Sequence, residues 1–194
     1  MKVCDLRVPT IAFLTILFMQ GAHADWDAKH LKMIRGAATT LRQAIATVER
    51  ELKGKAFAAE TAASDEAIVY TVKVLTSDKA MSATVEAKTG KMTASAVATG
   101  ESAAQLKEFT KIKGTLLAAI RAAETTAKGK AFEAGFKHGG GKSLFEVDAA
   151  GRDDVEKDVV IDAISGKIRK VTEKSAEAAG SGASAQVPAV QPTP

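Results

Sequence analysis

Residues 53–57 read KGKAF, and the same five letters return at residues 128–132, 75 positions later. The agreement continues downstream of this pentapeptide, where VYTV at residues 69–72 corresponds to LFEV at residues 144–147. Both tetrapeptides alternate apolar with polar or smaller residues, which is typical of a half-buried strand. The pentapeptide therefore stands at the same place in two copies of one structural unit.

The match extends over the whole of each copy. After one inserted residue, VEAKTGKM at residues 85–92 corresponds to IDAISGKI at residues 161–168. Upstream, the apolar and acidic positions agree as well: Leu41, Ala44, Ile45 and Glu49 match Leu116, Ala119, Ile120 and Glu124. A repeat of this length predicts two small tandem modules rather than a solenoid.

Each copy begins with apolar residues spaced by three and four, which predicts an amphipathic helical segment. Gly36 interrupts this spacing, so we expect a short helix, a turn and a longer helix. Alternating runs then predict up to four strands in each copy, joined by local connections. The predicted fold class is α+β, with two tandem modules, each a helical segment packed on an antiparallel sheet of three to four strands.

The ends of the helices and hairpins carry their own signals. Thr40 and Gln43 have the spacing of a capping box, and Ser102 is the cap candidate of the second copy. Gly54 and Gly129 are expected to be the left-handed residues that end the long helices. The turns at 88–91 and 164–167 each contain a glycine before the returning strand, as hairpins with a bulge require.

The two ends of the chain differ in composition from the repeat. Lys2 and Arg7 precede a short apolar run, and the segment ends in the small-residue pattern Ala22-His23-Ala24. This pattern predicts a secretory signal peptide and an extracytoplasmic protein, either periplasmic or secreted; the alternative is an uncleaved anchor or a buried strand. The expected division is a signal peptide at 1–24, modules at 25–99 and 100–173, and a disordered tail at 174–194, which holds three of the four prolines.

Composition excludes several functions. The net charge is +4, falls to +3 without residues 1–24, and is not gathered into a basic block interleaved with aromatics, so nucleic acid is not an expected partner. The one cysteine, Cys4, leaves with the signal peptide, which excludes disulfides and multi-cysteine metal sites. No integral membrane segment is expected after cleavage.

The second copy resembles the PepSY domain family in three stretches. These are GKAFEA at 129–134, KSLFEV at 142–147 and IDAISGKI at 161–168. The first copy departs from the family pattern at Thr71, where the family often has Glu, and at Glu86, where it often has Asp. The resemblance covers residues 28–172 in tandem copies. It implies an extracytoplasmic module that inhibits or regulates a peptidase, as in the propeptides of secreted metallopeptidases. The double-module plan is also similar to that of secreted β-lactamase inhibitor proteins, by architecture alone.

One exposed segment is the candidate contact site. Residues 137–142 read KHGGGK, in which three glycines between basic residues offer amides to an anion, and Lys137, His138 and Lys142 offer positive charge. The segment lacks the spacing of a phosphate-binding loop, so a flexible hairpin loop is the simpler interpretation.

No other residue set points to chemistry. The acidic run from Asp148 to Asp158 lacks the spacing of an EF-hand and is interpreted as a solvated hairpin loop. Asp162 and Glu86 stand before turns, where a carboxylate accepts turn amides. We expect no catalytic residues, no metal ligands and no cofactor.

The expected function is therefore that of an exported, non-enzymatic binding protein, an inhibitor or regulator of a secreted or envelope peptidase. Two alternatives remain open: an envelope scaffold, and a protein that binds a small ligand or a metal ion.

Overall fold

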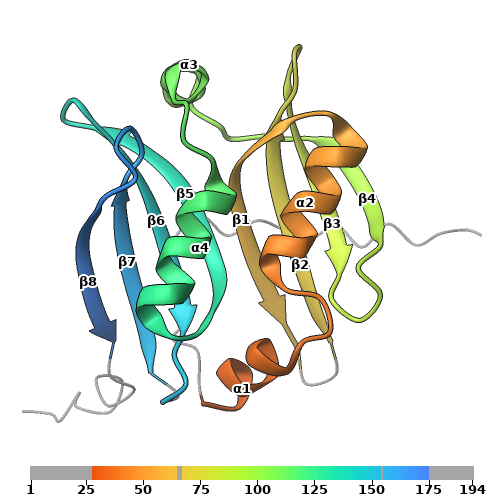
Figure 1. Cartoon of the computed structure of the whole chain (residues 1–194). Coiled ribbons are helices and arrows are strands. Elements are labelled where there is room, and N and C mark those ends of the chain that lie inside the picture. The colour runs from red at the N-terminus through yellow and green to blue at the C-terminus, as the bar shows by residue number, and fades with distance from the viewer. Residues whose placement is uncertain (1–27, 65–66, 154, 175–194) are drawn as a thin grey trace, which may run out of the picture.

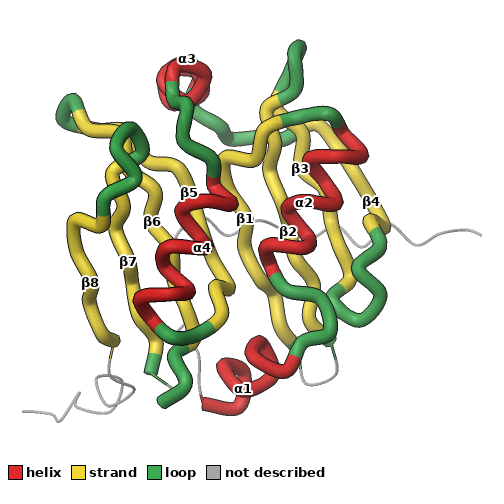
Figure 2. Tube along the Cα trace, viewed as in Figure 1, coloured by secondary structure: helices red, strands yellow, loops and turns green. Residues whose placement is uncertain are grey.

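The computed structural model describes residues 28–64, 67–153 and 155–174. Within them, eight strands form one antiparallel sheet in the order β4-β3-β2-β1-β5-β6-β7-β8 (Figure 1). The two long helices lie side by side on one face of this sheet, and the short helices lie at its ends (Figure 2). The predicted signal peptide and all but the first residue of the predicted tail lie outside the described residues.

The two copies fold alike. The first contains α1 (Ala28–Gly36), α2 (Leu41–Leu52), β1 (Lys55–Ala63), β2 (Ile68–Leu75), β3 (Ala80–Glu86) and β4 (Met92–Val97). The second contains α3 (Ala103–Lys111), α4 (Leu116–Ala127), β5 (Lys130–Gly139), β6 (Lys142–Ala150), β7 (Glu156–Asp162) and β8 (Ile168–Lys174). The predicted α+β class is confirmed, with four strands in each module. No helix in the described part is long and apolar enough to cross a membrane.

The helix starts follow the prediction and the helix ends do not. Thr40 and Gln43 form the capping box at the start of α2. The left-handed residues that end α2 and α4 are Lys53 and Lys128, with φ of 50° and 52°. The assignment of this role to Gly54 and Gly129 is wrong, because both glycines are required by the neighbouring strand instead of by the helix cap.

Each glycine of the repeated KGKAF lies against a carbonyl group of its own sheet. A Cβ on Gly54 would lie 3.0 Å from the Leu75 oxygen, and one on Gly129 would lie 2.0 Å from the Ala150 oxygen. A preceding glutamate completes the connection, since Glu49 accepts the Ala56 amide and Glu124 accepts the Ala131 amide. The repeated sequence thus fixes the turn from each long helix into the first strand of its module.

The modules join through the first strand of each. β1 pairs with β5 antiparallel over three positions, and Ala59 lies opposite Ala134. These two alanines are equivalent in the repeat, 75 positions apart, so an approximate twofold axis passes between them. The Thr61 hydroxyl also donates across this junction to the Phe132 carbonyl. The duplication therefore produces one continuous sheet rather than two separate modules.

The short helices strengthen this junction. In the N-terminal module, α1 reaches across to the other half, where Arg35 donates to the Gly151 carbonyl at 2.8 Å. In the C-terminal module, Phe109 of α3 packs against Phe57 of β1 with ring centroids 5.9 Å apart. Lys55 of β1 lies over the Phe109 ring at 4.6 Å. Each half therefore contributes a short helix that touches a strand or turn of the other half.

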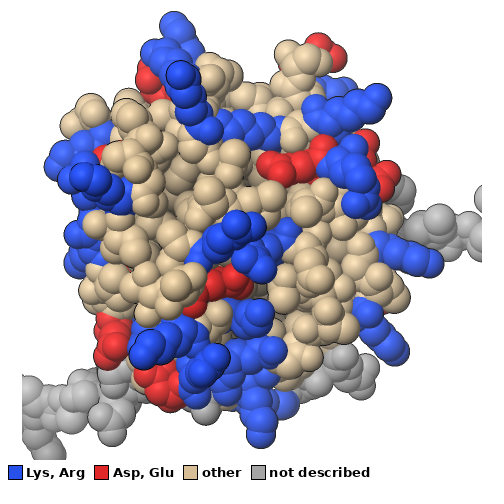
Figure 3. Space-filling model, viewed as in Figure 1, with Lys and Arg blue, Asp and Glu red and all other residues tan. Residues whose placement is uncertain are grey.

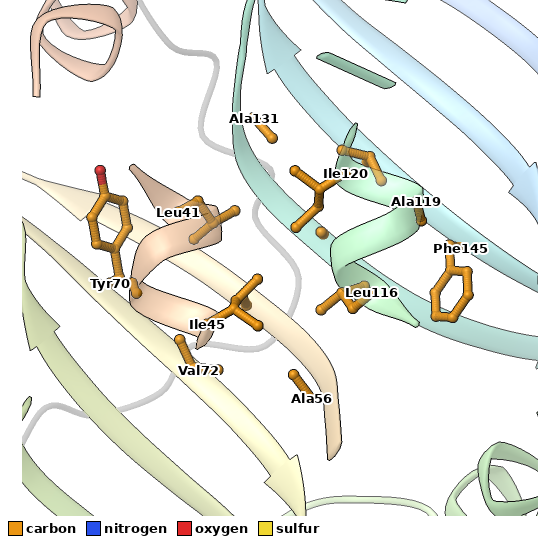
Figure 4. Close-up of a cluster of buried hydrophobic side chains, with 14 of the residues drawn as sticks. Leu41, Ile45, Ala56, Tyr70, Val72, Leu116, Ala119, Ile120, Ala131 and Phe145 are labelled. Carbon is orange, nitrogen blue, oxygen red and sulfur yellow. The ribbon is translucent and has the colours of Figure 1, made fainter. Parts of the chain in front are cut away.

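One hydrophobic core runs beneath both long helices. Side chains from α2 and α4, among them Ile45 and Leu116, fill the space between the helices and the sheet (Figure 4). Tyr70 is the largest polar side chain of this core; it is 1% exposed, and its hydroxyl donates to the Thr39 carbonyl at 2.6 Å. Burial raises the pKa of Tyr70 to about 12.

The two KGKAF glycines make a matched pair of predictions. Gly129→Ala forces a side chain against the Ala150 carbonyl, so we expect it to lower the free energy of unfolding by about 3 kcal/mol or more, the upper part of the range for overpacking. Gly54→Ala meets a looser contact and should cost about 1 kcal/mol. Denaturant unfolding of both variants measures the difference, and equal losses would contradict the assigned contacts.

Because Tyr70 is buried, we expect the free energy of unfolding to fall at alkaline pH. Because its pKa is raised from 10.0 to about 12, the folded state holds the phenolic proton more tightly than the unfolded state. The contribution is complete below pH 10 and is lost as the pH rises toward 12. Since Tyr70 is the one tyrosine of the chain, tyrosinate absorbance reports it directly. Titration near pH 10 in the folded protein would disprove the burial effect.

Candidate functional site

The face of the sheet opposite α2 and α4 carries a hollow of polar character. It is a groove of about 320 Å³ at the junction of the modules. Its lining is drawn from both halves of the chain: Phe57, Ala58, Ala59, Glu60, Thr71, Lys73, Gly100, Glu101, Gln105, Glu133, Ala134, Gly135, Phe136, Lys137, Glu146 and Asp148. We call this surface the open face, because the long helices cover only the other side (Figure 1).

The groove exists because two small residues meet at its floor. Ala58 of β1 lies directly opposite Gly135 of β5. A Cβ on Gly135 would meet no atom within 4 Å, so the space above this glycine is open. One wall is fixed by the segment between the modules, where Glu101 bonds Lys73 at 2.7 Å.

Carboxylates follow one another across the open face. The strand register places Glu60 opposite Glu133, Glu133 opposite Asp148, and Asp148 opposite Asp158. Directly opposed residues share a face of a sheet, and like charges in such positions destabilise it. A row of opposed carboxylates lowers the stability of the sheet. Surfaces that bind partners often carry such unfavourable arrangements.

Lys174 of β8 counters part of this charge. Its Nζ donates to Glu156 at 2.6 Å and to Asp148 at 3.3 Å, and both carboxylates are nearly buried. Burial acts to lower the pKa of Lys174, but the hydrogen bond to Glu156 and the charges of Asp148 and Glu156 outweigh it and raise the pKa. Lys174 was predicted as the first tail residue, and these contacts hold it in the sheet.

The opposite face has the opposite charge. The helical segments, residues 28–53 and 103–128, contain eleven Lys or Arg and four Glu. Figure 3 shows this side, where the visible charges are mostly Lys and Arg and gather mainly around the margins. Arg42 of α2 pairs with Glu124 of α4 at 3.3 Å across the module boundary. The molecule is therefore basic on its helical side and acidic along the row on its open face.

The structure divides the three predicted contact residues. Residues 137–142 are not a flexible loop but the end of a tight hairpin, whose two turn residues, Gly140 and Gly141, have φ of 56° and 72°. Lys137 and Lys142 are exposed on the open face, and Lys137 lines the groove. His138 points to the helical side, where its Nδ1 lies 2.9 Å from the Ser143 hydroxyl.

The strand register explains why His138 lies on the other face from the two lysines. Phe136 lies opposite Phe145, and both are buried under the helices. Side chains alternate between faces along a strand, so His138 shares the face of Phe136 and the two lysines take the other. The structure thus brings Lys137 and Lys142 to one surface and separates His138 from them.

Of the two carboxylates that stand before turns, Asp162 accepts turn amides as the sequence indicates, and Glu86 does not. Asp162 accepts the Ser165 amide at 2.8 Å and the Ile164 amide at 3.2 Å, and it binds Arg169 at 2.7 Å. The Ser165 amide, followed by Arg169, holds the pKa of Asp162 well below its usual range. Glu86, one carbon longer, instead accepts the Thr89 hydroxyl at 2.7 Å.

The predicted acidic loop is partly a strand. Asp148 and Glu156 belong to β6 and β7, and Asp153 pairs with Lys157 at 3.1 Å; Asp154 lies outside the described residues. Within the described part of the chain, no group of three His, Cys, Asp or Glu has the arrangement of a metal site.

Comparison with known proteins identifies the repeat. The family model described as the peptidase propeptide and YPEB domain, PepSY, matches residues 40–95 and again residues 114–172. The two matches together span more than half of the chain and coincide with the two halves of the sheet. The chain belongs to the PepSY family. The predicted resemblance and its tandem arrangement are confirmed.

Individual proteins add little to this assignment. No curated protein matches the chain. Two solved structures are similar to parts of it: a putative lipoprotein from Clostridium difficile 630, with 17% identity over 71% of this chain and 95% of that one and a TM-score of 0.42, and the YpmB protein from Bacillus subtilis, with 18% identity over 68% and 96% and a TM-score of 0.32. Neither score is high enough to support an argument about function.

The groove was not predicted from the sequence. Its floor depends on the pairing of Ala58 with Gly135, two residues far apart in the chain. A glycine inside an alternating strand pattern signals a close approach or an open space, and Gly135 is such a residue. That signal identifies one half of the groove floor and leaves the strand that pairs with it unknown.

Lys174 gives a prediction for this face. Lys174→Met leaves Asp148 and Glu156 nearly buried without their shared cation, so we expect a loss of about 1–3 kcal/mol at neutral pH. This expected loss lies between the values typical of an exposed ion pair and of a buried one, because the Lys174 side chain is 38% exposed. The raised pKa of Lys174 means that its contribution is complete below pH 10.5 and is lost as pH rises through the higher folded value.

Denaturant unfolding of this variant at several pH values is the measurement. Lys170→Met removes a charge from the same strand and is the matched control. Equal effects of the two substitutions at neutral pH would argue against the Lys174 network.

Proposed function

We propose that this PepSY protein is an exported, non-enzymatic binding protein that inhibits or regulates a secreted or envelope peptidase. The observation that carries the proposal is the tandem match to a domain described from peptidase propeptides, placed twice in one sheet with no other domain between the copies. The signal-like segment at residues 1–24 supports export.

The side-chain arrangement supports a binding role over catalysis. His138 and Ser143 are the pair that most resembles a base and a nucleophile, at 2.9 Å. Ser143 is only 8% exposed, which hinders attack on a substrate. The nearby Glu108 carboxylate bonds Lys111 at 2.7 Å, which leaves it poorly suited to orient the imidazole.

The open face supports a docking surface. Only one side of the sheet is covered by the long helices, and the other holds the groove at the module junction. The hairpin that carries Lys137 and Lys142 stands at one end of this face. We therefore keep Lys137, His138 and Lys142 as proposed contact residues, with His138 reaching a partner only around the edge of the hairpin.

Inhibition of peptidase activity tests the proposal. Residues 25–194 are added to the secreted and envelope fractions of the source organism, and hydrolysis of a labelled protein substrate is followed. We expect hydrolysis to slow until a stoichiometric complex forms, which gel filtration then detects. A variant with Lys137, His138 and Lys142 all changed to Ala should inhibit less.

The control removes the same number of lysines elsewhere. Lys88→Ala with Lys91→Ala changes the exposed β3–β4 hairpin of the first module and should inhibit like the unchanged protein. If the folded protein slows no peptidase and forms no complex with one, the proposed function is wrong. Equal inhibition by the hairpin variant would retain the function and remove these three contact residues.

A further inference from the structure

The sheet has two outer strands with very different surfaces. β4 and β8 are its edges, and they occupy equivalent places in the two copies. β4 reads MTASAV and carries no charge, whereas β8 reads IRKVTEK, with four charged residues in seven. Five of the six β4 residues are exposed, and Val97 is 54% exposed.

An edge strand presents backbone N–H and C=O groups to any extended chain that approaches it. Proteins protect such edges with charged residues, lysine above all, with proline, or by covering them. β8 is protected by Arg169, Lys170, Glu173 and Lys174. β4 has neither charge nor proline, and among the described strands only β3 pairs with it.

We propose that β4 is a docking edge, to which an extended segment of a partner polypeptide adds as a further strand through backbone hydrogen bonds. The inference rests on the proposed function, whose partner it specifies. The segment is uncharged. Its side chains on the helical side are small or apolar, because they lie beside Ser95 and Val97, and those on the open face are small, because they lie beside Ala94 and Ala96.

The edge has two other candidate occupants, and each fits less well. The chain's own residues 175–194 contain Pro188, Pro192 and Pro194 and two glycines, a composition that is unfavourable in a strand. A second copy of the protein would pair two six-residue edges, a short contact for an interface that has to bury roughly 1,200 Å², and the mass measurement below distinguishes it.

A peptide as long as β4, with Thr and Val alternating, is the probe. Every second amide is N-methylated, so that the peptide pairs through one edge and does not aggregate. We expect it to shift the amide resonances of residues 92–97 and to slow their hydrogen exchange, with no such change at β8. The same peptide with a central proline is the negative probe.

Two variants exploit the matched edges. Ala94→Lys with Ala96→Lys gives β4 the protection of β8 and should weaken peptide binding several-fold. Arg169→Thr with Lys170→Ala and Glu173→Ala removes charge from β8 and should create a second binding edge. Amide spectra away from the edges verify that each variant is folded, and the lysine variant alone decides the question if the β8 variant is unstable.

The possible results of these experiments test the docking edge and the proposed function separately. No change at residues 92–97, or a change that the lysines do not weaken, overturns the docking edge. Changes in β4 that depend on protein concentration alone, with a doubled mass, show that a second copy covers it and also overturn the proposal. Peptide binding with neither peptidase inhibition nor a complex with a peptidase supports the edge and contradicts the proposed function. Inhibition with no peptide binding retains the function and removes the edge.

Discussion

The pairing of β1 with β5 is the contact on which the rest of the molecule depends. It covers only three positions, yet it converts two four-stranded sheets into one of eight strands. A module of about 70 residues buries little apolar surface on its own. The shared sheet, the neighbouring long helices and the crossing short helices give both halves one core. The groove also lies over this junction, so the same contact supports folding and creates the hollow.

The two faces of this sheet have separate roles. The helical face holds the core, and its visible charges are mostly Lys and Arg (Figure 3). The open face carries opposed carboxylates that a purely structural sheet would avoid. Lys174, on the last described strand, offsets Asp148 of this row together with the neighbouring Glu156. A charge difference of this kind orients a protein as it approaches a charged partner, before any contact forms.

The sequence predicted correctly those features that depend on residues close together in the chain. The capping box at Thr40, the hairpin turns and the strands all followed from spacing alone. The predictions failed where a distant group decides the outcome. Gly54 was assigned to the helix cap, but the Leu75 carbonyl is what requires a glycine there. His138 was grouped with Lys137, and only the register that opposes Phe136 to Phe145 separates them. The groove needs a pairing between modules, which no local pattern encodes.

The approximate twofold axis has a consequence for how the groove arose. In a symmetric pair of first copies, Glu60 would oppose Ala58, and in a pair of second copies Glu133 would oppose Gly135. Neither arrangement joins two carboxylates, and neither joins two small residues on the open face. Fusion of two diverged copies in one chain opposes Glu60 to Glu133 and Ala58 to Gly135 instead. The hollow and the acidic pair beside it therefore require two different copies in one sheet. A dimer of identical single modules would have neither.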